Sequence, residues 1–189
     1  MTVAAAVLAA GEGSRFDGPT HKLLAPFRGR PVVQWAIEAA DAAGFNQLFV
    51  IQGAVDLRDT VAEVVDGRAT LVDNPAWAEG QASSLRAAID AAKAAGHRAL
   101  VVGLGDQPLV PASAWRSVGA AAGPIVTATF DGARRPPVKF ESSVWDEVPG
   151  IGDEGARSLL KRRPELVSEL PCTGNAVDID TLEDLRRWS

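Results

Sequence analysis

Residues 3–15 read VAAAVLAAGEGSR, an apolar run, Val3–Leu8, that passes directly into a glycine-containing turn. A short run that is apolar on both faces predicts a buried strand of a parallel sheet. Small residues after such a strand let the backbone approach a ligand closely, and consecutive free N–H groups form an anion cradle. Because ligands bind beyond the carboxyl ends of parallel strands, the stretch predicts the first strand of an α/β sheet with an anion site behind it.

The rest of the chain repeats this alternation of short apolar runs and longer helical patterns. The pattern predicts further strands at Gln47–Gln52, Ala69–Val72, Ala99–Gly103, Ile125–Phe130, Val138–Phe140 and Ala176–Ile179. It predicts helices at Pro31–Ala43, Val55–Val65, Ser83–Ala95 and Gly155–Arg162, and a last helix from Thr181, where Thr-Leu-Glu-Asp has the form of a capping box. We therefore predict one domain over residues 1–189, a three-layer α/β/α fold with a mainly parallel sheet.

Composition and charge narrow the function classes. The 189 residues carry a formal net charge of −5 without a basic block, which disfavours binding to nucleic acid by phosphate neutralisation. No apolar run reaches the roughly 20 residues that a membrane helix needs. The N-terminal run has no basic segment before it, which disfavours a signal peptide. Cys172 is the only cysteine, so no disulfide can form within the chain, and we expect a cytoplasmic protein.

Two cations follow the first strand. Arg15 and Lys22 would bring full positive charges against a triphosphate, although a solvated turn with ordinary surface cations has the same composition. The turn is not a P-loop, because no Gly-Lys-Ser/Thr ends it. It also lacks the third glycine of the dinucleotide fingerprint, since Phe16 stands there. That difference disfavours a dinucleotide-dependent oxidoreductase.

Two later loops carry further candidates. Asn74–Leu85 reads NPAWAEGQASSL, where Gly80 permits close approach of the backbone and the serine pair either caps the following helix or binds an anion. Trp77 in the same loop is interpreted as a packing residue. Gly103–Pro108 reads GLGDQP directly after a strand, and Asp106 there either holds a hard cation or stabilises the turn.

The C-terminal segment Gly174–Leu185 carries several carboxylates around the start of the last helix. Acidic side chains in the first turn of a helix are stabilised by its dipole. Asp180, Glu183 and Asp184 therefore either cap this helix or belong to a site.

Together these segments resemble the MobA-like nucleotidyltransferases, and most closely the molybdenum cofactor cytidylyltransferases. The matching motifs follow the order of that family: LAAGEGSR with Lys22, NPAWAEGQASSL, GDQP, PPVKF at 136–140, GDEGARSLL at 152–160 and DIDTLEDL at 178–185. Lys139 stands where the family has leucine, and Leu182 where it has proline. The resemblance implies a Rossmann-like fold of the nucleotide-diphospho-sugar transferase type.

The resemblance also implies roles for individual residues. It makes Arg15, Lys22 and Asp106 catalytic, and it assigns Asp106 to a divalent cation, Mg²⁺ or Mn²⁺, with either Asn175 or Asp178 as a second ligand. The residues that would bind the nucleotide are Leu8, Ala9, Ala10, Gly11, Gly13, Ser14, Arg15, Lys22, Gly80, Gln81 and Ser84. Those that would bind the acceptor are Pro137, Gly152, Asp153 and Arg157.

The reaction implied by the resemblance is the transfer of CMP from CTP to the phosphate of a molybdopterin-type acceptor, with release of pyrophosphate. Ala10 favours the cytidylyl branch, because guanylyl relatives more often have glycine there. A molybdenum hydroxylase apoenzyme would be the partner that receives the product. Two alternatives stay open: a transferase of the same fold that uses GTP or another phosphorylated acceptor, and a carrier of the molybdenum cofactor without catalysis.

Overall fold

The computed structural model describes residues 2–65 and 67–189, and a seven-stranded sheet runs through it in the order β5-β4-β1-β6-β8-β7-β9. The strands are β1 Val3–Ala9, β4 Gln47–Gln52, β5 Ala69–Asp73, β6 Ala99–Leu104, β7 Ile125–Phe130, β8 Ala133–Glu141 and β9 Val167–Pro171, and a separate ribbon pairs β2 Pro26–Phe27 with β3 Arg30–Pro31. β8 runs antiparallel to β6 and β7, while the other neighbours in the large sheet are parallel. The predicted mainly parallel sheet is confirmed.

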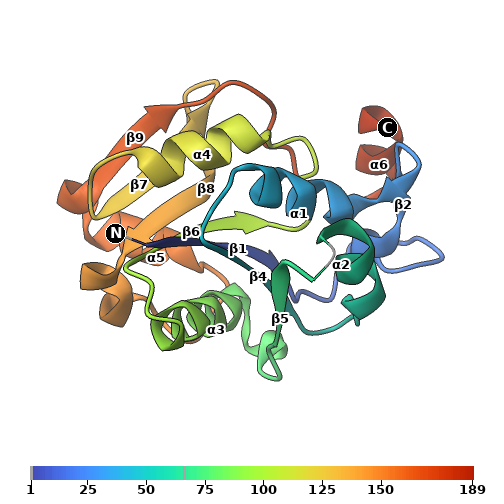
Figure 1. The fold of residues 1–189 in the computed structure, drawn as a ribbon. Coiled ribbons are helices and arrows are strands. Elements are labelled where there is room, and N and C mark those ends of the chain that lie inside the picture. Colours follow the sequence, from blue (N-terminus) through green and yellow to red (C-terminus); the bar gives the residue numbers. More distant parts are fainter. Residues whose placement is uncertain (1, 66) are drawn as a thin grey trace.

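Helices cover both faces of this sheet, which gives the three layers predicted from the sequence (Figure 1). One face carries α1 Val32–Ala42, α2 Arg58–Val65 and α4 Ala112–Ala120, and the other carries α3 Gln81–Ala94, the 3₁₀ helix η3 Ser142–Glu147 and α5 Ala156–Arg162. Successive side chains of a strand point to opposite faces. In β1, Ala5 and Val7 therefore pack against the first group of helices, and Ala4 and Ala6 against the second.

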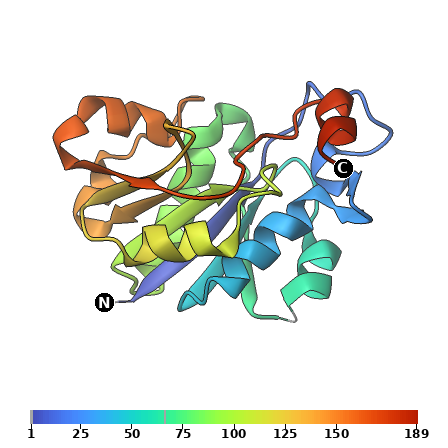
Figure 2. The same ribbon diagram turned by 90° about the horizontal axis from the view of Figure 1, so that it is seen from above.

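The C-terminal segment lies beside the segment that follows β1. After β9 the chain crosses back over the carboxyl ends of the strands, and α6 Leu182–Trp188 lies next to β2 and β3 (Figure 2). Ile179 is fully buried in a small cluster with Phe27 and Val32. The predicted capping box is confirmed, because Thr181 caps α6 and exchanges hydrogen bonds with Asp184.

The structure corrects the predicted strand Ala176–Ile179, which pairs with no strand among the described residues. Three of its four residues are apolar, and the segment lies against the loop that follows β6, where the Ile179 N–H donates to the Asp106 carbonyl at 2.9 Å. The strand at the sheet edge is instead β9, which mixes polar and apolar residues and exposes Ser168, Glu169 and Pro171, so it lacks the apolar pattern of a buried strand. The structure also adds α4, which the sequence pattern does not predict, and β8 begins five residues before the predicted start at Val138.

Lys139 departs from the family pattern for a reason that lies in the packing. Its side chain is 2% exposed, donates to the carbonyl of Ala121 and lies 3.8 Å from the Glu141 carboxylate. Ala121 ends α4, and a positive charge is favourable at the carboxyl end of a helix. Lys139 is thus part of the scaffold.

Across the described residues, no helix has both the length and the apolar character needed to cross a membrane.

Candidate active site

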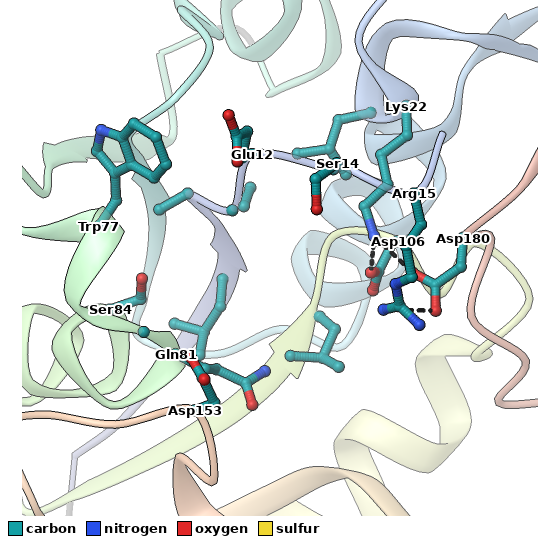
Figure 3. A pocket seen from close by; sticks show the side chains of 18 of the residues that line it. Glu12, Ser14, Arg15, Lys22, Trp77, Gln81, Ser84, Asp106, Asp153 and Asp180 are labelled. Carbon is teal, nitrogen blue, oxygen red and sulfur yellow. Dashed lines mark hydrogen bonds and ion pairs between the residues drawn. The ribbon is translucent and has the colours of Figure 1, made fainter. Parts of the chain in front are cut away.

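A cavity of about 380 Å³ opens at the carboxyl ends of β1 and β6 (Figure 3). Its wall includes every residue implied for nucleotide binding: Leu8, Ala9, Ala10, Gly11, Gly13, Ser14, Arg15, Lys22, Gly80, Gln81 and Ser84. The remaining wall residues are Glu12, Leu23, Trp77, Ala78, Leu104, Asp106, Asp153 and Asp180. The loops after β1 and β6 meet here because these two strands are neighbours in one sheet, and the segment 77–84, Asp153 and Asp180 complete the wall.

Lys22 lies between two carboxylates at one end of this cavity. It belongs to the 3₁₀ helix η1, Lys22–Leu24, and its Nζ donates to Asp106 Oδ2 at 2.6 Å and to Asp180 Oδ1 at 2.9 Å. Burial disfavours its ammonium form, but the two carboxylates outweigh burial and raise the pKa of Lys22 above the ordinary lysine value. Lys22 is therefore a fixed positive charge at neutral pH.

Arg15 adds a second cation from the other side of Asp180. Its guanidinium lies 3.0 Å from Asp180 Oδ2, while the Arg15 side chain is 75% exposed (Figure 3). An exposed ion pair of this kind is weak, so Arg15 can exchange Asp180 for a phosphate at little cost.

Asp106 has one oxygen without a partner. Asp106 Oδ2 accepts from Lys22, whereas Oδ1 is buried and, within residues 2–65 and 67–189, has no hydrogen-bond partner. A buried carboxylate oxygen left unpaired costs free energy. The oxygen is thus suited to a cation or donor that arrives with a ligand.

The two candidates for a second metal ligand differ in their surroundings. Asp178 feels the charge of Asp106, whereas the side-chain oxygen of Asn175 accepts a hydrogen bond from the backbone. Gln107 donates to Asp178 Oδ1 at 2.9 Å, and burial together with the Asp106 charge raises the pKa of Asp178. Asn175 Oδ1 accepts from the Val177 N–H at 2.9 Å. Neither side chain lines the cavity.

The described residues contain no cluster of three or more His, Cys, Asp or Glu side chains that could hold a metal. Mg²⁺, however, is commonly held by one or two carboxylates, with substrate phosphates and water as the other ligands. The unpaired Asp106 oxygen, with Asp178 nearby, fits a cation that binds together with a nucleotide.

Gly80 lets a second loop close one side of the cavity. It has a φ of +102°, and a Cβ there would lie 2.6 Å from Gly152 backbone atoms and from Asp153 Oδ1. The Gly152 N–H donates to the Glu79 carbonyl at 3.0 Å, and the Gly152 carbonyl accepts from the Ala82 N–H at 2.9 Å. Gly152 thus supports the wall without lining it, and Asp153 reaches the cavity.

We expect Gly80→Ala to destabilise the protein by about 2–3 kcal/mol, from the left-handed backbone and the clash together. It should also weaken nucleotide binding, because the loop at 152–153 must move. Gly96→Ala is the matched control, since Gly96 has a φ of +77° and open space around it. Thermal unfolding and calorimetric titration with CTP measure both effects. Equal losses of CTP affinity in the two variants would contradict a specific role of Gly80.

A second, smaller cavity of about 90 Å³ adjoins the first and shares Leu8, Gln81 and Leu104 with it. Its wall is largely apolar, with Leu85, Val102, Val138, Phe140 and Leu160. Three arginines, Arg134, Arg135 and Arg157, and one acidic residue, Glu154, also line it.

The residues that the family resemblance implies for acceptor binding do not all line the same cavity. Arg157 lines the second cavity and Asp153 the first. Pro137 lines neither cavity, although Pro136 and Val138 on either side of it line the second.

Sequence reasoning missed several residues of the two walls. Arg134 and Arg135 lie between the predicted strands Ile125–Phe130 and Val138–Phe140, and the sequence analysis gives them no role, although two adjacent arginines before PPVKF are a visible signal. For Asp180 the sequence leaves capping and a site both open, and the structure places this residue on the cavity with Lys22. Trp77 packs against the core as expected but also lines the first cavity. Nothing in the sequence singled out Glu12.

Two named proteins are similar to this chain, one over nearly its full length and one over about half of it. A protein named nicotine blue oxidoreductase, from Paenarthrobacter nicotinovorans, is 31% identical over an aligned length of 203 positions, which covers 98% of this chain and 95% of that protein. A 2-C-methyl-D-erythritol 4-phosphate cytidylyltransferase from Cereibacter sphaeroides is 32% identical over 113 residues, 58% of this chain and 49% of that enzyme.

Solved structures agree with this similarity. Rv0371c from Mycobacterium tuberculosis H37Rv superposes with a TM-score of 0.80 at 29% identity, covering 100% of this chain and 97% of that one. Its complex with manganese has a TM-score of 0.77 at 27% identity, covering 100% and 98%. Residues 5–167 match the family described as the MobA-like NTP transferase domain. The chain is a member of this family of nucleotidyltransferases.

Proposed function

We propose that the protein transfers CMP from CTP to the phosphate of a molybdopterin-type acceptor and releases pyrophosphate. The observation that carries this proposal is the pair of adjoining cavities, one with a glycine-containing loop and two cations, the other largely apolar with three arginines and one glutamate. The first suits a nucleoside triphosphate, and the second suits a flat organic body with an anionic group. The similarity to a cytidylyltransferase supports CTP as the donor.

In this reaction an oxygen of the acceptor phosphate attacks the α-phosphorus of CTP in line, and the bond to the pyrophosphate oxygen breaks. The protein supplies position and charge. The backbone at 11–14 would cradle the triphosphate, and Arg15 and Lys22 would neutralise the charge that builds up on pyrophosphate. Arg157 would hold the acceptor.

The ion pairs of the site couple the binding of the triphosphate to the binding of a divalent cation. Lys22 pairs with Asp106 and Asp180, and Arg15 pairs with Asp180. A bound triphosphate would give both cations new partners and free the carboxylates. A divalent cation held by Asp106 and Asp178 would stabilise charge on the phosphate oxygens. The manganese complex of the similar Rv0371c supports such an ion, and we propose Mg²⁺ or Mn²⁺.

The test is pyrophosphate release with Mg²⁺ and molybdopterin, with or without molybdenum, offering CTP, GTP, ATP and UTP separately. Release with CTP alone supports the proposal. Release with GTP alone would overturn the base assignment and keep the reaction. Failure with all four nucleotides while molybdopterin still binds would favour a carrier, which would pass the cofactor to a molybdenum hydroxylase apoenzyme without modifying it.

The acceptor cavity has its own variant. Arg157→Gln should raise the KM for molybdopterin about 10-fold or more and leave the KM for CTP unchanged, because a charge-assisted hydrogen bond is lost. Arg162→Gln, on the same helix, is the matched control, since Arg162 donates to the Glu147 carbonyl and lines neither cavity. A raised KM for CTP in Arg157→Gln would contradict the division between the two cavities.

The relative named nicotine blue oxidoreductase favours a second candidate, an oxidoreductase, because the similarity spans 98% of this chain. Phe16, in place of the third fingerprint glycine, argues against a nicotinamide dinucleotide in the first cavity. Fluorescence titration with NADH and NADPH decides between the candidates: binding that CTP displaces would favour the oxidoreductase.

A further inference from the structure

Asn74 follows β5 and is 4% exposed beneath the first cavity. Its Oδ1 accepts from the Ala76 N–H at 3.1 Å, and its Nδ2 donates to Ser83 Oγ at 2.9 Å and to Ser84 Oγ at 3.1 Å. Because a backbone N–H can only donate, the amide oxygen must face Ala76 and the NH₂ group must face the serines. The orientation of the Asn74 amide is therefore determined by its surroundings.

The two serine hydroxyls that accept hydrogen bonds from the Asn74 amide differ in the acceptors available for their own protons. Ser83 Oγ donates to the Gly80 carbonyl at 2.8 Å, so its donor is used. Ser84 is 6% exposed and lines the cavity (Figure 3), and no acceptor for its proton is found within the described ranges. Asn74 offers Ser84 only N–H groups, so the Ser84 hydroxyl needs a hydrogen-bond acceptor from a ligand in the cavity.

We propose that Asn74 is a positioning residue that keeps Ser84 a hydrogen-bond donor toward the nucleotide, so that the atom facing Ser84 must be an acceptor. The inference rests on the proposed function, because it requires a nucleotide in this cavity. Cytosine presents two adjacent acceptors on one edge, O2 and N3. A base with an N–H at the facing position leaves the Ser84 proton unpaired, which costs free energy in a buried site. Ser84 lies in the part of the cavity away from Arg15 and Lys22 (Figure 3), and the phosphates belong beside those two cations, which leaves the end near Ser84 to the base. Asn74 and Ser84 together thus contribute to base selection.

Replacing the amide by a carboxylate tests this polarity. In Asn74→Asp, the new side chain can only accept, so the Ser84 hydroxyl turns toward it and presents lone pairs to the base. We expect the Kd for CTP, measured by calorimetry with Mg²⁺, to rise about 3- to 10-fold in Ser84→Ala, where one neutral hydrogen bond is lost. We expect a rise of about 50-fold in Asn74→Asp, where an acceptor also faces an acceptor.

The double variant gives the decisive comparison. If Asn74 acts through Ser84, Asn74→Asp with Ser84→Ala should return to the affinity of Ser84→Ala alone, since no hydroxyl remains to be reversed. A role limited to packing predicts a double variant at least as weak as Asn74→Asp. That result would overturn the inference.

Ser83→Ala is the matched control, because Ser83 receives the same amide but does not line the cavity. Its Kd for CTP should change less than about 2-fold. Should Asn74→Asp fail to fold, the comparison of Ser84→Ala with Ser83→Ala still decides, and equal affinities would overturn the inference. The readout needs no acceptor, so CTP binding with the expected pattern but no transfer would refute only the proposed reaction. Transfer without the pattern would refute only this inference.

Discussion

Asp106→Asn is expected to lower the rate of pyrophosphate release about 10³-fold. The substitution keeps the size of the side chain but removes the charge that would hold the proposed cation, and stabilisation by a metal at developing phosphate charge accounts for several kcal/mol. The Asp106 oxygen without a hydrogen-bond partner in the described part of the chain is the observation behind this expectation. A continuous pyrophosphate assay over a range of Mg²⁺ and Mn²⁺ concentrations measures the change.

The matched control is Asp73→Asn. Asp73 also lies at the carboxyl end of a strand and accepts from Gln52 Nε2 at 2.6 Å, but it lines neither cavity. Its rate should stay within about 2-fold of the unmodified protein, because the asparagine oxygen can still accept. A full rate in Asp106→Asn, or an equal loss in both variants, would contradict the assignment of Asp106.

Lys22→Met is expected to act on both stability and nucleotide binding. Asp106 and Asp180 would lose their shared cation, and removing one partner of a partly buried ion pair costs about 2–3 kcal/mol of unfolding free energy here, less than for a fully buried pair. CTP affinity should fall about 10- to 100-fold, because a charge-assisted contact to phosphate is lost. Chemical unfolding and calorimetric titration measure the two effects.

The pH dependence and a metal titration sharpen this prediction. Because the folded-state pKa of Lys22 is raised, its stabilisation is fully present at neutral pH and is lost only as the pH rises through that raised value. Mn²⁺ should raise the Tm of Lys22→Met more than that of the unmodified protein, since Asp106 then has lost its cationic partner and Asp180 keeps only the exposed Arg15.

Lys161→Gln serves as the control for Lys22→Met, because its partner Glu154 is largely exposed. Its unfolding transition should stay close to that of the unmodified protein, because an exposed ion pair contributes little. If Mn²⁺ raises the Tm of the unmodified protein and of Lys22→Met equally, the proposal that the carboxylates beside Lys22 attract the cation is contradicted.

The sequence by itself determined the alternation of strands and helices and the loop that follows β1. These features depend on residues close together in the chain: the apolar run of β1, the small residues of its turn and the Thr181 capping box. Local signals of this kind also placed Asp106 directly behind a strand. They failed where burial is incomplete, as in β9, whose half-exposed residues carry no strand pattern.

The tertiary structure alone decided which distant side chains meet. Lys22 pairs with Asp106 and Asp180 across 84 and 158 positions of sequence, and no local pattern encodes such a contact. The extended segment 176–179 looked like a strand, but it crosses the ends of the sheet instead of pairing at an edge. Strand order brought Arg134 and Arg135 to the cavity of Arg157. A sequence predicts the pieces because their forces are local, whereas the site depends on contacts that exist only once the layers have packed.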